Sequence, residues 1–425
     1  MNILLLNPHS PQNAGDLAIL QESLACLRAA HPDARISVTI NDPRPEELLP
    51  PGAEYLESLV RWLVDIDEAG RWHWHKRRAP LVALWLLLAA FAYRAAGLRL
   101  LPRQPARRRL MTAFYDADLV VVFGGGHLYA RHGANISFLW LALGLALAII
   151  MGKPLVMLPQ SLGPVAGRAQ RRLLRWLVER SSLVAAREFR SLRFLHQIGV
   201  RRPVQVLPDL AFTTAEAPAE RARELLAPYL AGVDPARPLV GFTLMDWGSQ
   251  NDRFRRQERY EAAVRAAIAH LQDRYGAEVV VFSQCFGPSP DQDDRRIARR
   301  VAAQLAPERR IIVVDEALSP QELKAAYRQM RAMVATRMHS AIFALCAEVP
   351  TLVIGYLHKS EGIMETLGLE RYAVAIDKVE PEPIRAMIDQ LWADQEPIRA
   401  RLRRRIPALS RTLEHLPRLI REVTA

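Results

Sequence analysis

The stretch 332–369 constrains the fold most, because it alternates short apolar strands with helices. A strand at 333–335 runs into Arg337 and His339, and after a helix a second apolar strand, 351–354, leads to Lys359. The same alternation recurs through most of the chain, without an internal repeat. Short apolar strands that alternate with helices predict parallel sheets covered by helices on both faces. We therefore expect an α/β fold.

The length of the chain favours two domains, since 425 residues exceed what one ordinary hydrophobic core supports. We expect a first domain at 1–210 and a second at 239–425. Residues 211–238, rich in Thr, Ala, Pro and Glu, are the predicted linker region. The stretch around 62–109 interrupts the regular alternation and is interpreted as a basic and apolar insert in the first domain.

The formal net charge is +12 and comes almost wholly from arginine. Such a charge fits three kinds of partner: nucleic acid, an anionic membrane surface, or phosphorylated ligands. No stripe of basic residues alternates with exposed aromatic residues, and no nucleic-acid-binding motif is present. We therefore expect no nucleic-acid partner.

The insert contains an apolar run, 81–93, that raises the question of membrane contact. The run is free of charge, is flanked by arginines and lysine, and has tryptophans at its near edge. As a helix, thirteen residues would reach ~20 Å, against a hydrocarbon core of ~30 Å. The region 72–109 thus suits a helix or hairpin that lies on an anionic leaflet. The alternative is a buried helix of the first domain.

The cellular location is expected to be cytoplasmic, with an alternative of peripheral attachment at the inner face of the cell membrane. The N-terminus begins directly with a strand and lacks the features of a signal peptide. The three cysteines, Cys26, Cys285 and Cys346, are far apart and odd in number, which favours buried, reduced thiols.

Three candidate functional residues lie at predicted strand ends in the second half: Arg337, His339 and Lys359. In open α/β sheets, ligands bind beyond the carboxyl ends of the strands. A guanidinium, an imidazole and an ammonium gathered there suit an anionic substrate that also needs a proton moved. The alternatives are a structural histidine at a helix start and an exposed lysine paired with Glu361.

Further candidates lie at strand ends of the first half. They are the anion-binding glycine loop with Gly125 and Gly126, the loop residues Asn13 and Asp16, the turn residues Gln160 and Ser161, and Arg187. Each has a structural alternative: a tight turn, a helix N-cap by Asp16, or a surface ion pair between Arg187 and Glu188. Histidines at metal-ligand spacing lack carboxylate or cysteine companions, so no metal site is expected.

Taken in order, these motifs resemble the polysaccharide pyruvyl transferase family. The matching pieces are Asn13-Ala-Gly15-Asp16, Gly124–Gly126, Pro159–Pro164, Ala186–Glu188 with Ser191, Pro208-Asp209, Arg337-Met-His339, and Pro350–Tyr356 with Lys359. The insert has no counterpart that we can place. The resemblance implies a GT-B-like fold, in which two Rossmann-like domains face a cleft.

The resemblance also implies a reaction. The family transfers the enolpyruvyl-derived unit of phosphoenolpyruvate to a sugar of a cell-surface polysaccharide or its precursor, giving a pyruvate ketal and phosphate. It associates residues like Arg187, Arg337 and His339 with the donor. We expect His339 to be the catalytic acid, Arg187, Arg337 and Lys359 to bind the donor, and no cofactor beyond phosphoenolpyruvate as donor substrate. The acceptor is expected to be a sugar or a lipid-linked saccharide.

Two other functions compete with this interpretation. One is a GT-B glycosyltransferase that uses a nucleotide-sugar. The other is a non-catalytic, membrane-peripheral scaffold for polysaccharide assembly, which the gathered cations disfavour.

Overall fold

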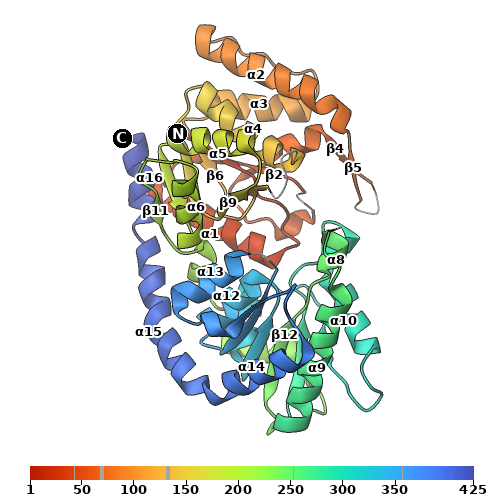
Figure 1. Cartoon of the computed structure of the whole chain (residues 1–425). Helices are drawn as coiled ribbons and strands as arrows, with labels where there is room; N and C mark the ends of the chain where they lie inside the picture. The colour runs from red at the N-terminus through yellow and green to blue at the C-terminus, as the bar shows by residue number, and fades with distance from the viewer. Residues whose placement is uncertain (43, 68–70, 131–134, 252, 357) are drawn as a thin grey trace. The chain divides into compact units, whose positions relative to one another are not determined.

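The computed structural model describes residues 1–425 except 43, 68–70, 131–134, 252 and 357. The chain forms two compact units. The first unit comprises Met1–Pro11, Asp16–Leu210 and Arg411–Ala425, and the second comprises Gln12–Gly15 and Ala211–Ser410. Each unit has a central parallel sheet with helices around it (Figure 1). This confirms the predicted fold class of two Rossmann-like domains with helix-covered parallel sheets.

The described part of the first unit has a seven-stranded sheet in the order β11-β10-β8-β6-β1-β2-β3. All of its pairings are parallel, with Ile3 of β1 opposite Ile36 of β2 on one side and Leu119 of β6 on the other. The central strands are buried because their residues are almost all apolar. The strands are β1 Asn2–Leu6, β2 Arg35–Ile40, β3 Glu54–Glu57, β6 Leu119–Val122, β8 Leu155–Gln160, β10 Leu183–Ala186 and β11 Gln205–Val206.

Two helices of the first unit have an end that a capping residue defines. Asn135 caps α4 by accepting a hydrogen bond from the backbone N–H of Phe138 (2.9 Å), and α2 ends at Gly97 in the left-handed conformation that glycine favours (φ 67°). The helices are α1 Ala14–Ala30, α2 Ala79–Ala96, α3 Pro105–Asp116, α4 Ile136–Ile150, α5 Arg168–Arg180, α6 Phe189–Gln197 and α16 Leu416–Thr424. A small parallel pair joins β7 Leu128–Ala130 to β9 Leu162–Val165.

The insert is more regular than the sequence pattern indicated. Outside residues 68–70, which the structure does not describe, it forms the antiparallel hairpin β4 Val64–Ile66 and β5 Trp72–Trp74, followed by α2 and α3. The 3-10 turn and helix at Lys76–Ala96 are long and apolar enough to cross a membrane, by length and composition.

Helix α2 has two apolar faces with different surroundings. Leu86, Ala89 and Ala90 are fully buried in the core of the first unit, where α2 packs on α4. A second stripe is exposed: Leu81 (73%), Leu84 (55%), Leu88 (56%) and Phe91 (56%). The prediction of a buried helix holds for the face with Leu86, Ala89 and Ala90, and the prediction of a surface helix holds for the stripe with Leu84 and Leu88.

The second unit has a six-stranded parallel sheet among its described residues, in the order β14-β13-β12-β15-β16-β17. This order, outward from β12 in both directions, is that of a Rossmann fold. The strands are β12 Leu239–Thr243, β13 Glu278–Phe282, β14 Ile312–Val314, β15 Ala332–Ala335, β16 Thr351–Gly355 and β17 Ala373–Ala375. The helices are α7 Ala219–Leu226, α8 Trp247–Gln250, α9 Gln257–Tyr275, α10 Asp294–Ala303, α11 Pro320–Arg328, α12 Met338–Cys346, α13 His358–Leu367, α14 Pro381–Ala393 and α15 Gln395–Leu413.

The division differs from the predicted domains in three places, the first of which is the segment Gln12–Gly15 in the second unit. The stretch 211–238 is part of the second unit, because it is held there by hydrogen bonds from the ammonium of Lys324 to the carbonyl of Thr214 (2.7 Å) and from the N–H of Ala217 to the carbonyl of Gln321 (3.1 Å). Helix α16 belongs to the first unit and not to the second. Its Leu416 and Ile420 are fully buried, and it packs on β10.

Candidate active site

The carboxyl edge of the second unit's sheet carries most of the polar residues predicted there. Strands β15 and β16 are neighbours, so the loops that begin at Thr336 and Tyr356 start side by side. Arg337 and His339 follow β15, and Lys359 follows β16 in the first turn of α13. The structure thus brings the three predicted residues to one edge of one sheet.

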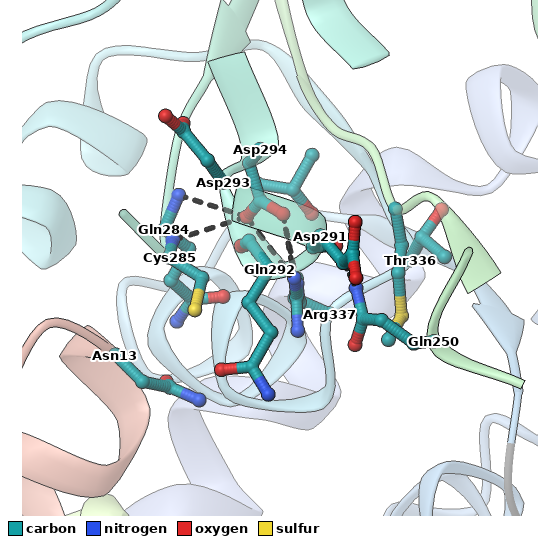
Figure 2. Close-up of polar contacts among 12 residues, drawn as sticks. Asn13, Gln250, Gln284, Cys285, Asp291, Gln292, Asp293, Asp294, Thr336 and Arg337 are labelled. Atoms are coloured by element: carbon teal, nitrogen blue, oxygen red, sulfur yellow. Dashed lines mark hydrogen bonds and ion pairs between the residues drawn. The ribbon is translucent and has the colours of Figure 1, made fainter. Parts of the chain in front are cut away.

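Arg337 is held by a carboxylate that the sequence analysis missed. Its Nη2 donates to Oδ1 of Asp294 (2.6 Å), and its Nε lies 3.2 Å from both carboxylate oxygens (Figure 2). Both side chains are nearly inaccessible, at 9% and 2% exposure. Burial lowers the pKa of Arg337, but the charge of Asp294 and its neighbours raises it by more, so the guanidinium stays charged.

Asp294 also fixes the loop after β13. Its Oδ2 accepts hydrogen bonds from the backbone N–H groups of Gln284 (3.2 Å) and Cys285 (3.0 Å). One carboxylate therefore joins the loops after β13 and β15 to the first turn of α10. In sequence it is one of several aspartates before a helix, where Asp293 already acts as the N-cap, so no sequence signal distinguishes it.

The segment Gln12–Gly15 lies against the same loops of the second unit. The N–H of Ala14 donates to the carbonyl of Gln284 (3.0 Å), and Asn13 forms an antiparallel bridge with Cys285. Figure 2 shows Asn13 near Cys285. Two motifs from opposite ends of the predicted set, Asn13-Ala-Gly15 and Arg337-Met-His339, are thereby brought together.

Gly15 is required by a close approach to His339. A Cβ at position 15 would lie 2.0 Å from Nδ1 of His339, so only glycine lets the backbone rest against the imidazole. The predicted alternative of an Asp16 N-cap is wrong in detail. Helix α1 begins at Ala14, and Asn13 occupies the cap position, with its Oδ1 accepting from the N–H of Gly15 (3.0 Å). Asp16 lies in the first turn.

His339 lies in the first turn of α12; the residue is partly exposed, while the Nε2 of its ring is buried. Lys359 lies near an aromatic pair: its Nζ is 5.8 Å from the centre of the Tyr356 ring, which lies 4.8 Å from the Trp247 ring. Trp247, at the start of α8, was not among the predicted residues.

Two buried side chains at this edge have no hydrogen-bond partner among the described atoms. They are the hydroxyl of Ser283 and both side-chain polar atoms of Gln284, at 2% and 1% residue exposure. Leaving such groups unsatisfied costs about 1–3 kcal/mol each. Buried groups of this kind mark places where water or a ligand completes the hydrogen bonding.

The first unit has its own cluster at the carboxyl edge of its sheet. Arg187 donates through Nε to Oγ of Ser161 (2.7 Å) and through Nη1 to Oδ2 of Asp209 (2.5 Å), and its Nε is 3.4 Å from Glu188. All of the charged side chains involved are at most 1% exposed. The predicted alternative of a surface ion pair is therefore wrong, because the pair is buried. Nη2 of Arg187 is also buried, without a hydrogen-bond partner among the described atoms.

The remaining predicted residues of the first unit pack around this cluster. The carbonyl of Gly125 accepts from the N–H of Ser161 (2.7 Å), and the carbonyl of Gln160 accepts from the N–H of Arg187 (3.1 Å). A Cβ on Gly125 would lie 2.6 Å from Nε2 of His127. The imidazole of His127, which follows Gly126, therefore occupies the space beside Gly125. These contacts of Gly125 fit the structural alternative of a tight turn. Among the described residues no group of three or more His, Cys, Asp or Glu side chains is placed to hold a metal ion.

Comparison with solved structures agrees with the fold. The UDP-GlcNAc 2-epimerase of Neisseria meningitidis bound to UDP-GlcNAc matches with a TM-score of 0.59 at 10% identity, covering 99% of each chain. The S. aureus MnaA–UDP co-structure matches with a TM-score of 0.57 at 12% identity, covering 100% of this chain and 98% of the other. The spinosyn forosaminyltransferase SpnP gives 0.51 at 15% identity, with full coverage of both chains. At these identities the likeness shows a GT-B-like fold alone.

Comparison with sequences identifies the family. The amylovoran biosynthesis protein AmsJ of Erwinia amylovora is 26% identical over 268 residues, which are 61% of this chain and 63% of AmsJ. The chain thus spans somewhat less than two thirds of this curated relative. The profile of the polysaccharide pyruvyl transferase family matches residues 13–358, a span that begins at Asn13 and contains both His339 and the Arg187 cluster. The chain belongs to the polysaccharide pyruvyl transferase family.

Proposed function

We propose that this chain transfers the enolpyruvyl-derived unit of phosphoenolpyruvate to a sugar of a cell-surface polysaccharide or its precursor, forming a pyruvate ketal and releasing phosphate. The observation that carries the proposal is the close approach of Gly15 to the His339 ring, because it unites two motifs of the family beside the buried Arg337–Asp294 pair.

His339 is the proposed acid. Protonation of the methylene carbon of phosphoenolpyruvate makes its C2 electrophilic. A sugar hydroxyl then attacks C2, phosphate leaves, and a neighbouring hydroxyl closes the ketal. One hydroxyl proton returns to the imidazole and the other leaves with phosphate or water. General acid–base assistance of this kind is commonly worth ~10²–10⁴-fold in rate.

The cations at the same edge are the proposed donor ligands. Phosphoenolpyruvate carries a carboxylate and a phosphate, which guanidinium groups bind in bidentate geometry. Arg337 uses Nε and Nη2 for Asp294, so Nη1 is its proposed donor to the substrate, and Lys359 supplies a second charge. Arg187 makes its contacts within the first unit, and only its Nη2 is left for a ligand in this arrangement.

The test is phosphate release from phosphoenolpyruvate with a panel of sugars and lipid-linked saccharides. Release should depend on one acceptor and match ketal formation one for one. A nucleotide-sugar glycosyltransferase is the second candidate, favoured only by the fold. It predicts that a nucleotide-sugar raises the melting temperature while phosphoenolpyruvate does not, and that no acceptor on the panel stimulates release.

We also infer that the exposed stripe of α2 contacts an anionic membrane. The stripe of Leu81, Leu84, Leu88 and Phe91 lies opposite the face that packs in the core, and the exposed Lys76, Arg77 and Arg78 precede it. Basic residues beside an apolar helix face favour an anionic bilayer surface. Because its other face is packed along α4, the helix would lie in the interface rather than cross it. A lipid-linked acceptor would then be met at the same surface.

A further inference from the structure

A cavity in the first unit has the lining of a saccharide site. It measures about 310 Å³, at the lower end of the ~300–1,000 Å³ typical of small-molecule sites. It lies at the carboxyl ends of β1 and β2, whose next residues, Asn7 and Asn41, line it. In open parallel sheets this is the edge where ligands bind. The insert supplies another wall through Trp72 and Trp74.

The two tryptophans are presented by the geometry of the hairpin. Residues two apart on a strand face the same side, so Trp72 and Trp74 both line the cavity while His73 between them does not. The ring centres of Trp72 and Trp74 are 6.4 Å apart, and the Trp72 ring lies 5.6 Å from that of His9. His73 is instead exposed and pairs with Asp67 (3.0 Å).

The polar side of the cavity is built from side-chain amides. Asn41 is held by Ser58, whose hydroxyl donates to its Oδ1 (2.6 Å), and its Nδ2 lies 3.2 Å from Nδ1 of His9. Asn7 adopts a left-handed backbone conformation (φ 77°), and its Nδ2 is buried without a hydrogen-bond partner among the described atoms. A strained backbone and an unsatisfied amide at one position indicate a functional constraint.

The chemistry of this lining selects a neutral polyhydroxylated ring. Among the described residues the lining combines indole rings with amides, hydroxyls and the imidazoles of His9 and His127, and it has no Lys, Arg, Asp or Glu. A sugar ring presents an apolar C–H face that packs on an indole, and hydroxyls that exchange hydrogen bonds with amides. We propose that this cavity binds one saccharide unit of the acceptor and that the insert hairpin determines which sugar is accepted. The role of the bound sugar as acceptor rests on the proposed function, whereas the binding itself does not.

The experiment tests the binding of a sugar separately from its role as acceptor. Binding of a panel of methyl hexopyranosides to the full-length protein is measured by saturation-transfer NMR, with glycerol as a polyol that lacks a ring. At least one glycoside should bind wild type, and Trp72→Ala and Trp74→Ala should each weaken binding by ~2–10-fold, the strength of one aromatic packing contact. The matched control is His73→Ala, on the opposite face of the same strand, which should bind as wild type does. Trp72→Phe, which keeps a ring, should stay within a few-fold even if the alanine variants fold poorly.

Turnover measurements test whether the bound sugar is the acceptor. With phosphoenolpyruvate as donor, the tryptophan variants should raise the KM for the acceptor and leave the KM for phosphoenolpyruvate unchanged. Failure of the proposed function would abolish turnover but leave glycoside binding sensitive to Trp72 and Trp74. The inference about the cavity is overturned if no glycoside binds wild type, or if both tryptophan variants bind as wild type, or if His73→Ala weakens binding equally.

Discussion

Gly15→Ala places a methyl group where the imidazole of His339 lies. The new Cβ would be 2.0 Å from Nδ1, 2.3 Å from Cγ and 2.7 Å from Cβ of His339, whereas ordinary contact begins at 3.4 Å. The ring or the backbone must therefore move by about 1.4 Å. A displacement of ~1 Å at a reacting group costs ~10²-fold in rate, so acceptor-dependent phosphate release should fall about 10²-fold. Overpacking should also destabilise the fold by ~1–3 kcal/mol.

The assay compares kcat/KM for phosphoenolpyruvate with the melting temperature of the same preparations. Gly144→Ala is the matched control, because its Cβ would meet only Leu59 and Leu6, at 3.5 and 3.7 Å, inside helix α4. That change should leave turnover near wild type and stabilise the helix by ~0.5–1 kcal/mol. If Gly15→Ala acts through His339, combining it with His339→Ala should be no worse than His339→Ala alone. A folded Gly15→Ala protein with turnover within a few-fold of wild type would refute the assigned role of His339.

Three further predictions concern charge, surface and thiol chemistry. Arg187→Ala removes the guanidinium from beside two buried carboxylates, Glu188 and Asp209, and should destabilise the fold by ~3–5 kcal/mol in urea unfolding. Arg223→Ala, from the exposed pair with Glu220, should change stability by less than ~1 kcal/mol, and similar effects of the two changes would contradict the buried network. Leu84→Gln combined with Leu88→Gln should reduce the fraction of the protein that sediments with phosphatidylglycerol-containing vesicles, and raised salt should reduce it too. An unchanged fraction in the double variant would show that α2 does not contact the membrane. Burial, together with the charge of Glu22, raises the pKa of Cys26 to about 12, so its thiol stays protonated in the folded protein at pH 8. Ellman's reagent should therefore modify Cys26 only when the protein unfolds. The free energy of unfolding should fall as the pH rises above 9.0, the usual pKa of a thiol, because the thiol then ionises in the unfolded protein first. Rapid modification of Cys26 in the native state would contradict that assignment.

The sequence predicts the strands and the site loops well where the signal is local. A short apolar run that is rich in β-branched residues and followed by glycines, such as Leu119–Val122, favours a buried strand, and the polar residues that follow parallel strands then lie at one sheet edge. The strands that were missed are short and mixed in character. Strand β3 reads EYLE and β5 reads WHW, so neither shows a period-two apolar pattern long enough to recognise.

The contacts that shape the site could not be predicted because they join distant parts of the chain. Asp294 pairs with Arg337 only because β13 and β15 both flank β12 in the sheet, which no spacing in the sequence reveals. The need for glycine at position 15 likewise depends on His339, which belongs to the other end of the family match. Local sequence patterns therefore locate the candidate residues. Only the tertiary structure shows which of their charges are paired with a buried carboxylate, as those of Arg187 and Arg337 are.

The place of α16 in the first unit has a consequence for how the protein is made. Its fully buried Leu416 and Ile420 belong to a unit whose sheet ends before Leu210, and the stretch 211–410 intervenes before the unit resumes at Arg411. At ~5–20 residues per second, a ribosome needs on the order of tens of seconds to add that stretch. Throughout that time the nascent first unit has an uncovered apolar site where α16 will pack. The first unit can therefore complete its core only after residues 211–410 have been synthesised.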